Sequence, residues 1–208
     1  MELTYQGLRN ESIILHTKTT VSQGELLTFY IDQTQGLNYI DHYNVNTDGT
    51  NLLLERIEIV NVGHSDLEKK FIRDSFNRID KIIDLDFTEM SHNNGSMLDI
   101  YQINYSSNFA ENTVGQALQQ KSNVGFWWDI LWMDSKLITG SQTDSNFNTI
   151  IHEIGHSLGL GHPFDDPTNE LWNSQDTVMS YNKGPNGWDT WFSDVDINAL
   201  ISIWGREN

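Results

Sequence analysis

The sequence HEIGHSLGLGH at residues 152–162 decides how the rest of this chain is interpreted. It contains three histidines, a glutamate directly after the first of them, and a glycine three residues after the second. Five such positions, three of them a rare residue type, would coincide by chance on the order of once in 10^5 chains of this length, given ordinary residue usage. The pattern H-E-x-x-H-x-x-G-x-x-H therefore indicates a metal-binding motif.

The spacing of the histidines predicts two ligands on one helix and a third beyond a turn. His152 and His156 are four residues apart, so on a helix they project from the same face. Gly159 tolerates a positive φ, which lets the helix end and the chain turn sharply. The turn can bring His162 back, whereas a continuous helix would place it about two turns from His156. The motif thus predicts one zinc ion held by His152, His156 and His162.

The same stretch predicts catalysis at the metal. Three neutral ligands leave one position for water, which is typical of catalytic rather than structural zinc sites, and zinc lowers the pKa of such a water towards about 7. Glu153 follows the first ligand, so its side chain is rotated about 100° from the metal axis and we expect it to act as general base. A helix with solvated histidines explains neither Gly159 nor the third histidine. A zinc site that binds without cleaving needs no Glu153.

Residues beyond the motif make this stretch resemble one family. Pro163 follows the third histidine, and TVMSY stands at residues 177–181. With the motif, these residues resemble the metzincin metallopeptidases, and the serralysin group in particular. The resemblance implies that Met179 belongs to a Met-turn that forms a hydrophobic floor beneath the metal. It also implies that Tyr181 is an extra zinc ligand, or a group that swings to stabilise the oxyanion of the reaction intermediate.

The resemblance implies an α+β fold of the metzincin type. A mixed, mostly parallel twisted sheet would pack on the active-site helix and on a second long helix, and a mainly irregular C-terminal subdomain would end in a helix. In the family, an edge strand binds the substrate as an added antiparallel strand. The residues matched to that strand are Gly115, Gln116, Ala117 and Leu118. Residues 51–208 would form the catalytic domain, and residues 1–50 an extension of unknown role, either a pro-segment or a β-subdomain.

Local patterns divide the chain into helices and strands. Apolar residues recur at helical spacing over residues 66–83 and 145–158. The sequence SDVD at residues 193–196 opens a third helix, which ends at Gly205. Strands are expected at residues 26–31, 52–60, 86–90, 98–105, 115–120 and 126–133, with turns at residues 35–36 and 48–49.

The composition excludes several classes of protein. The chain has 208 residues, 38% of them hydrophobic, which is enough for one domain with a sizeable core. It has no cysteine, so disulfides and thiolate ligands for zinc are excluded. The net charge of −17 argues against a nucleic acid or an anionic membrane as partner, and no apolar run reaches the roughly 20 residues of a membrane span. We expect a monomer that acts on protein or peptide substrates.

The resemblance places the protein outside the cell. However, neither a signal peptide nor the C-terminal calcium-binding repeats that accompany export in the serralysins are visible in this chain. Calcium could bind elsewhere, at Asp165, Asp166 and Asp176, but these residues lack a spaced loop motif. We interpret them as solvated turn residues.

The sequence is compatible with three functional classes. The first is a zinc-dependent endopeptidase in which Glu153 is the general base. The alternative is a latent or non-catalytic zinc-binding module that recognises substrates on the same fold. In that alternative, residues 1–50 would cover the cleft, and a carboxylate such as Asp32 or Asp41 would cap the zinc. A purely structural zinc protein is a third class, which would unfold on chelation and show no activity.

Overall fold

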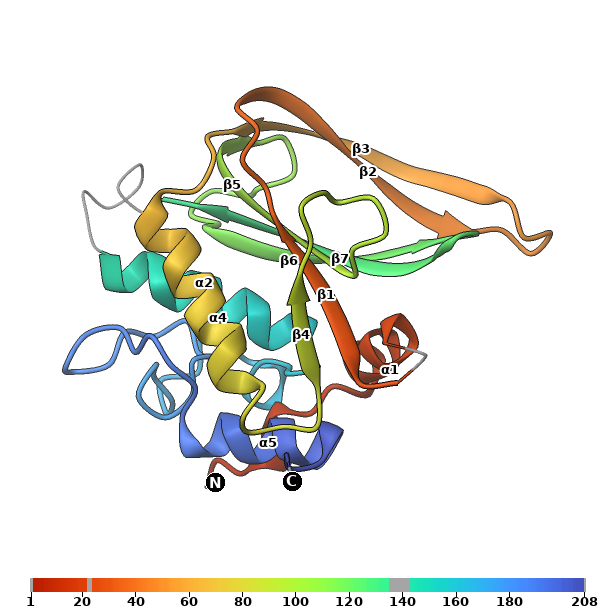
Figure 1. Cartoon of the computed structure of the whole chain (residues 1–208). Coiled ribbons are helices and arrows are strands. Elements are labelled where there is room, and N and C mark those ends of the chain that lie inside the picture. Colours follow the sequence, from red (N-terminus) through yellow and green to blue (C-terminus); the bar gives the residue numbers. More distant parts are fainter. Residues whose placement is uncertain (1, 22–23, 135–142, 208) are drawn as a thin grey trace.

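The computed structural model describes residues 2–21, 24–134 and 143–207, which form one seven-stranded sheet and four α-helices (Figure 1). The helices are α1 (Glu11–Thr20), α2 (Asp66–Ile79), α4 (Thr143–Ser157) and α5 (Asp194–Trp204). The strands are β1 (Leu26–Ile31), β2 (Gly36–Val45), β3 (Asn51–Asn61), β4 (Asp86–Glu89), β5 (Leu98–Ser106), β6 (Gly115–Ser122) and β7 (Gly125–Met133). Two short 3-10 turns are η1 (Tyr5–Leu8) and η2 (Pro163–Asp165). Within these residues, the helices are too short or too polar to cross a membrane.

Strand β5 is the centre of the sheet. On one side it pairs in parallel with β7, and on the other it pairs first with β1 in parallel and then with β3 antiparallel. The remaining strands extend the sheet, β4 parallel to β1, β2 antiparallel to β3, and β6 antiparallel to β7. The described strands thus form as many antiparallel as parallel pairs. The expected predominance of parallel pairs is wrong because two hairpins, β2–β3 and β6–β7, each add an antiparallel pair. The broader expectation of an α+β fold with one mixed sheet agrees with the structure.

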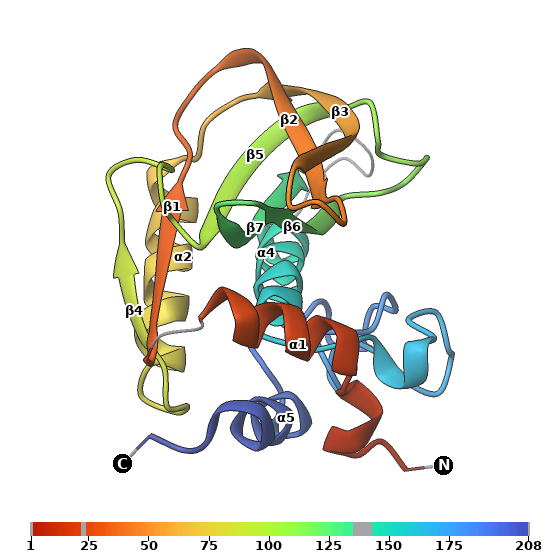
Figure 2. The same ribbon diagram turned by 90° about the vertical axis from the view of Figure 1, so that its right-hand side faces the viewer.

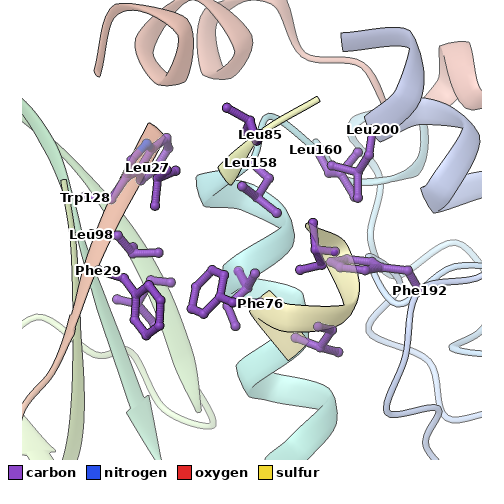
Figure 3. Close-up of a cluster of buried hydrophobic side chains, with 14 of the residues drawn as sticks. Leu27, Phe29, Phe76, Leu85, Leu98, Trp128, Leu158, Leu160, Phe192 and Leu200 are labelled. Carbon is purple, nitrogen blue, oxygen red and sulfur yellow. The ribbon is translucent and has the colours of Figure 1, made fainter. Parts of the chain in front are cut away.

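The two faces of the sheet carry separate hydrophobic cores. Alternate side chains of a strand point to opposite faces. Leu98 and Trp128 lie on the face that packs on α2 and α4, in the larger core (Figure 3). Tyr101 and Leu131 lie on the other face, in a smaller core closed by the β2–β3 hairpin. Figure 1 shows α2 and α4 below the sheet and the hairpin above it.

Helix α4 carries the first two histidines of the motif and is held firmly in the larger core. Its side chains Ile150, Ile151 and Ile154 are fully buried there. The helix packs against β6 and β7, as Figure 2 also shows. The flank of α4 that carries the histidines therefore has a fixed position relative to the edge strand β6.

Helix α2 is shorter than its apolar pattern predicts. It begins after a capping box formed by Ser65 and Glu68, and it ends at Ile79 rather than at residue 83. Ile83 is nevertheless fully buried, because its side chain packs in the larger core. The expected helix was too long because Ile83, which is apolar and buried but lies beyond the helix, fits the helical spacing of the preceding apolar residues.

The first part of the chain contains a helix that the sequence pattern did not indicate. The Oδ1 atom of Asn10 caps α1 by accepting hydrogen bonds from the backbone N–H groups of Ser12 and Ile13, at 3.1 and 3.3 Å. Inside the helix, three threonine hydroxyl groups donate to carbonyl groups four residues earlier. Threonine and serine have only moderate helix propensity, so the helix depends on its cap and its contacts rather than on an apolar stripe.

Strand β1 joins residues 26–31 to the same sheet as the later strands. It lies between β5 and β4, and Leu27 and Phe29 are buried in the larger core (Figure 3). The division of the chain at residue 50 stays a prediction, and that position falls in the turn between β2 and β3.

Two buried carboxyl groups lie side by side on the face of the sheet opposite to α4. Asp99 and Asp129 are direct neighbours on the parallel strands β5 and β7. Burial, and then the charge of Asp129, raises the pKa of Asp99 to about 8. Burial raises the pKa of Asp129 to about 6, against a hydrogen bond from Gln120 that lowers it. Because both pKa values exceed the unfolded value of about 3.9, the folded state binds more protons, and its stability falls as the pH rises from about 4 towards 8.

We predict that Asp99→Asn makes the protein less sensitive to alkaline pH. The gain in the free energy of unfolding over the parent should be larger at pH 8.5 than at pH 5 by more than about 1.4 kcal/mol, the equivalent of one pKa unit. Urea unfolding at both pH values measures this difference, with the exposed Asp48→Asn as control. A gain of equal size at the two pH values would contradict the prediction.

Candidate metal centre

Three histidines converge at the C-terminal end of α4. One ring nitrogen from each of His152, His156 and His162 lies within 4.8 Å of the other two. The Nε2 atoms of His156 and His162 are 3.2 Å apart. His152 is buried, and the other two histidines are half-buried. The structure therefore brings the three predicted ligands together, and they could hold a metal ion.

Two backbone carbonyl groups orient the imidazole rings. The Nδ1 atom of His152 lies 2.8 Å from the carbonyl oxygen of Val178, and Nδ1 of His156 lies 2.8 Å from that of Leu160. A carbonyl oxygen only accepts, so both Nδ1 atoms carry the hydrogen and both Nε2 atoms present a lone pair. Nε2 of His152 is buried and has no partner. A buried polar atom without a partner calls for a ligand, and Nδ1–H donation to a carbonyl is the usual support of a metal-binding histidine.

The three imidazoles are neutral at neutral pH. Burial lowers the pKa of His152, and the two neighbouring histidines lower it further. Burial and the proximity of His162 lower the pKa of His156 to about 4. Burial also lowers the pKa of His162. Metal binding needs the neutral ring, so the site favours the form that binds.

A tight turn after α4 returns the chain to the centre. The helix ends at Ser157, and Gly159 has a φ of 109°, a conformation that glycine adopts readily and other residues do not. The backbone N–H of Leu160 donates to the carbonyl of Gly155 at 2.9 Å. This bond places the carbonyl of Leu160 against His156.

Glu153 lies on α4 beside the triad and against the edge strand β6. It is buried, and burial raises the pKa of its carboxyl group to about 8, against a backbone hydrogen bond from Ala117 that lowers it. Its carboxylate also lies against the α-carbon of Gly115, where an added Cβ would stand only 2.4 Å from Oε1. A side chain at position 115 would therefore displace Glu153, which gives this glycine a role that the sequence did not indicate.

In the four residues matched to a substrate-binding strand, the backbone N–H and C=O groups point alternately towards β7 and away from it. The N–H of Met133 donates to the carbonyl of Val114 at 2.8 Å, so residue 114 faces β7. Backbone groups of an antiparallel strand alternate, which turns those of Gly115 and Ala117 outward and those of Gln116 and Leu118 towards β7. The hydrogen bond from the backbone N–H of Ala117 to Glu153 agrees with this alternation. The outward edge beside Glu153 is thus formed by residues 115 and 117, and the side chain of Leu118 lies in the smaller core.

Met179 packs against α4, and Tyr181 packs against two of the histidine rings. Met179 is fully buried, and its Sδ atom lies so close to Gly155 that an added Cβ there would stand 2.8 Å from it. The sulfur is therefore packed against α4 at Gly155, a residue that lies between His152 and His156 in the sequence. The ring of Tyr181 lies 5.4 Å from that of His152 and 5.0 Å from that of His162, centroid to centroid, and the residue is 53% exposed.

A cleft of about 490 Å³ opens in front of these residues. His152, Glu153 and Tyr181 are among the residues that line it. Asn148 and Trp188 also line it, and neither was indicated by the sequence, because a single polar or aromatic residue carries no spacing signal. The cleft is large enough for parts of a peptide chain to enter.

Asp196 supports the centre from α5 and was missed as a site residue. Its buried carboxylate accepts hydrogen bonds from Thr177 Oγ1, from the N–H of Val178 and from Ser193. Val178 in turn presents the carbonyl that orients His152. The sequence showed only the capping box at the start of α5, because contacts 18 or 19 residues apart leave no periodic pattern.

The carboxylates considered as zinc caps have other partners. Asp32 accepts hydrogen bonds from Thr34 and Asn61, and Asp41 forms two hydrogen bonds with Arg56. In the part of the chain that the structure describes, the histidine triad is the one group of three or more potential ligands that lie close enough to share an ion. The structure thus adds no support for calcium at Asp165, Asp166 and Asp176.

The site combines three convergent histidines with a buried carboxylate in a cleft, which defines a candidate metal centre with an adjacent proton acceptor. No model of a known protein family matches the chain. The chain is 32% identical over 92 residues to the serralysin of Photorhabdus laumondii. The matched segment is 43% of this chain and 17% of that protein. This partial similarity agrees with a metzincin-like relationship, as the motif does, and it covers only a small part of that protein.

We predict that Asp196→Ala destabilises the protein by about 3 kcal/mol, because it leaves several buried donors without an acceptor. The neighbouring Asp194→Ala is the control, since Asp194 is exposed in the same helical turn. Chemical denaturation measures both free energies of unfolding. Equal stability of the two variants would show that Asp196 does not hold the turn at residues 177–179.

Proposed function

We propose that this chain is a zinc-dependent endopeptidase. The observation that carries the proposal is the unpartnered Nε2 of His152, which is aimed into the triad beside the buried carboxylate of Glu153. A structural zinc site needs four protein ligands and no neighbouring base, whereas a catalytic site commonly has three and a carboxylate beside them. The motif, the cleft and the partial similarity to a serralysin support the same function.

The donor set fits zinc. Three neutral imidazoles are ligands that zinc accepts, and its Zn–N bonds of about 2.0–2.1 Å in a tetrahedron place nitrogen atoms about 3.3 Å apart. The 3.2 Å between Nε2 of His156 and Nε2 of His162 agrees with that spacing. The chain has no cysteine, so the softer thiolate sites typical of Cu(I) and iron–sulfur clusters are excluded. His152, His156 and His162 would hold the ion.

The residues around the triad would divide the chemistry among them. When bound, zinc would polarise the scissile carbonyl and acidify a water molecule. Glu153 would take the proton from the attacking water and deliver it to the nitrogen of the departing amine. Burial raises the pKa of its carboxyl group, which favours the protonated form that would deliver the proton in the second step. The Tyr181 hydroxyl would donate a hydrogen bond to the oxyanion of the tetrahedral intermediate.

The outward edge of β6 would align the substrate. An extended peptide can add to an exposed strand through main-chain hydrogen bonds. Gly115 and Ala117 turn backbone groups to this edge, although the N–H of Ala117 already donates to Glu153. We therefore propose that Gly115 and the carbonyl of Ala117 bind the peptide, and that Gln116 and Leu118 support the strand from behind.

The finer assignments follow from the same proposal. We propose a metzincin-like catalytic unit of the serralysin type, in which residues 177–181 form the Met-turn and Met179 its floor. Its substrates would be proteins or peptides outside the cell, and the enzyme would act as a monomer. The net charge of −17 favours cationic peptides over acidic ones.

We predict that Glu153→Ala retains zinc and lowers kcat for a peptide or casein substrate on the order of 10^3-fold, the usual contribution of a general base. The exposed Glu170→Ala serves as a matched control and should keep the activity of the parent. Zinc content by elemental analysis and the initial rate of cleavage are measured on the same samples. Cleavage by Glu153→Ala at the rate of the parent would rule out this residue as the base.

We predict that His156→Ala retains less than about a tenth of the zinc of the parent after dialysis against a weak chelator, because two imidazoles bind zinc far more weakly than three. His92→Ala, which removes an exposed histidine, should retain zinc fully. Metal content per chain is measured by elemental analysis. An unchanged zinc content of His156→Ala would refute the ligand assignment.

A further inference from the structure

The N-terminal segment Gly7–Asn10, here called the N-terminal strap, lies against the loop that carries the third histidine. The carbonyl of Leu8 accepts a hydrogen bond of 2.7 Å from the N–H of Gly161, the residue before His162. Arg9 and Leu160 form an isolated antiparallel bridge. The strap thus pairs with the turn as a short added strand, and its residues are not among those that line the cleft.

Two glycines allow this close approach. A Cβ added to Gly161 would stand 2.9 Å from the Cβ of Asn10, and one added to Gly7 would stand 2.8 Å from the ring of Phe164. Neither glycine has a positive φ, so the backbone would accept another residue. Space is therefore the reason for glycine at both positions, and the strap and the turn are packed as closely as their main chains allow.

The strap contacts residues that determine the positions of His156 and His162. The carbonyl of Leu160 accepts the Nδ1 hydrogen of His156. Phe164 and Asp165, two and three residues beyond His162, have φ values of 52° and 60°, which are strained for residues other than glycine. Surrounding contacts must hold such a conformation. The ring of Phe164 on Gly7 and the bond of 3.4 Å from Asn10 Nδ2 to Asp165 Oδ1 are two of them.

The strap is itself anchored to the body of the protein. Leu8 is fully buried in the larger core. The guanidinium of Arg9 donates to the hydroxyl of Ser202 in α5 at 3.0 Å. Helix α5 also holds the end of α4, since Trp204 Nε1 donates to the carbonyl of Leu158 at 2.8 Å. Figure 1 shows the N-terminal end of the chain beside α5.

We infer that the N-terminal strap is a positioning element of the metal centre, which holds His156 and His162 in the geometry that binds zinc and slows the release of the ion. The inference rests on the proposed function, because it concerns the same triad. It assigns to these first residues a supporting role behind the ligands. A segment that covers the cleft would have to lie near Glu153 and Tyr181.

Asn10→Asp separates this role from a general effect on stability. Asn10 has two functions, since its Oδ1 caps α1 and its Nδ2 donates to Asp165. Aspartate is as good a helix cap as asparagine, but it has no donor and would place a second carboxylate beside Asp165. The variant should therefore keep the stability of the metal-free protein and still disturb the loop after His162.

We predict that Asn10→Asp and Gly7→Ala release zinc roughly tenfold faster than the parent, the low end of the effect of losing a group that orients a ligand, because both residues act on the loop after His162. Transfer of zinc to a chromogenic chelator in excess measures the rate, and the visible spectrum of the cobalt-substituted protein reports the ligand geometry. Gln6→Ala is the control, because Gln6 is exposed in the same turn and its side chain accepts a hydrogen bond from Thr4 rather than contacting the loop after His162.

The outcomes separate the inference from the proposed function. Faster release and an altered cobalt spectrum in Asn10→Asp, with the stability and the Gln6→Ala control unchanged, support the strap. Release and spectra identical to those of the parent in Asn10→Asp overturn the inference, even if Gly7→Ala does not fold, and leave the peptidase proposal standing. A parent protein that binds no zinc overturns both.

Discussion

Two main-chain carbonyl groups, those of Leu160 and Val178, determine where the lone pairs of the histidines point. Each accepts the Nδ1 hydrogen of one imidazole at 2.8 Å and so leaves Nε2 free to bind. An imidazole can rotate about its side-chain bonds, and a hydrogen bond to a rigid acceptor removes that freedom before a metal arrives. The other features of the site can be understood as means of keeping these two carbonyls in place.

The carbonyls are held from two directions. Leu160 belongs to a turn that depends on the left-handed conformation of Gly159 and on the N-terminal strap behind it. Val178 belongs to a turn that is tied to the buried carboxylate of Asp196 in α5, which accepts hydrogen bonds from the N–H of Val178 and the hydroxyl of Thr177. The N-terminal strap and helix α5 therefore both support the metal centre, although they lie at opposite ends of the sequence. Helix α4 is fixed independently by its apolar side chains in the larger core.

The sequence was most informative where one element carries the signal. The four-residue spacing of His152 and His156 predicts a helix, and the glycine at position 159 predicts where it ends and how His162 returns. The structure has the helix, its end and the triad in that order. The start of α5 was predicted for the same reason, since a capping box lies within four residues. Each of these signals comes from residues close together in the chain, so it can be recognised in a single sequence.

Features that depend on distant contacts could not be predicted. Helix α1 has a cap but no clear apolar stripe, and the strap pairs with a turn about 150 residues later, which no periodicity records. The balance of parallel and antiparallel pairs depends on which strands become neighbours, and the direction of Gly115 and Ala117 depends on the register with β7. The crowding of Gly115 by Glu153 likewise exists only after β6 and α4 pack together.

The most direct test of the account is the zinc K-edge X-ray absorption spectrum of the purified protein. We expect one zinc per chain, with the multiple scattering of three imidazoles and a first shell of nitrogen and oxygen at about 2.0–2.1 Å. Zinc without imidazole scattering, or no zinc bound under conditions where the protein is folded, would contradict the proposed site.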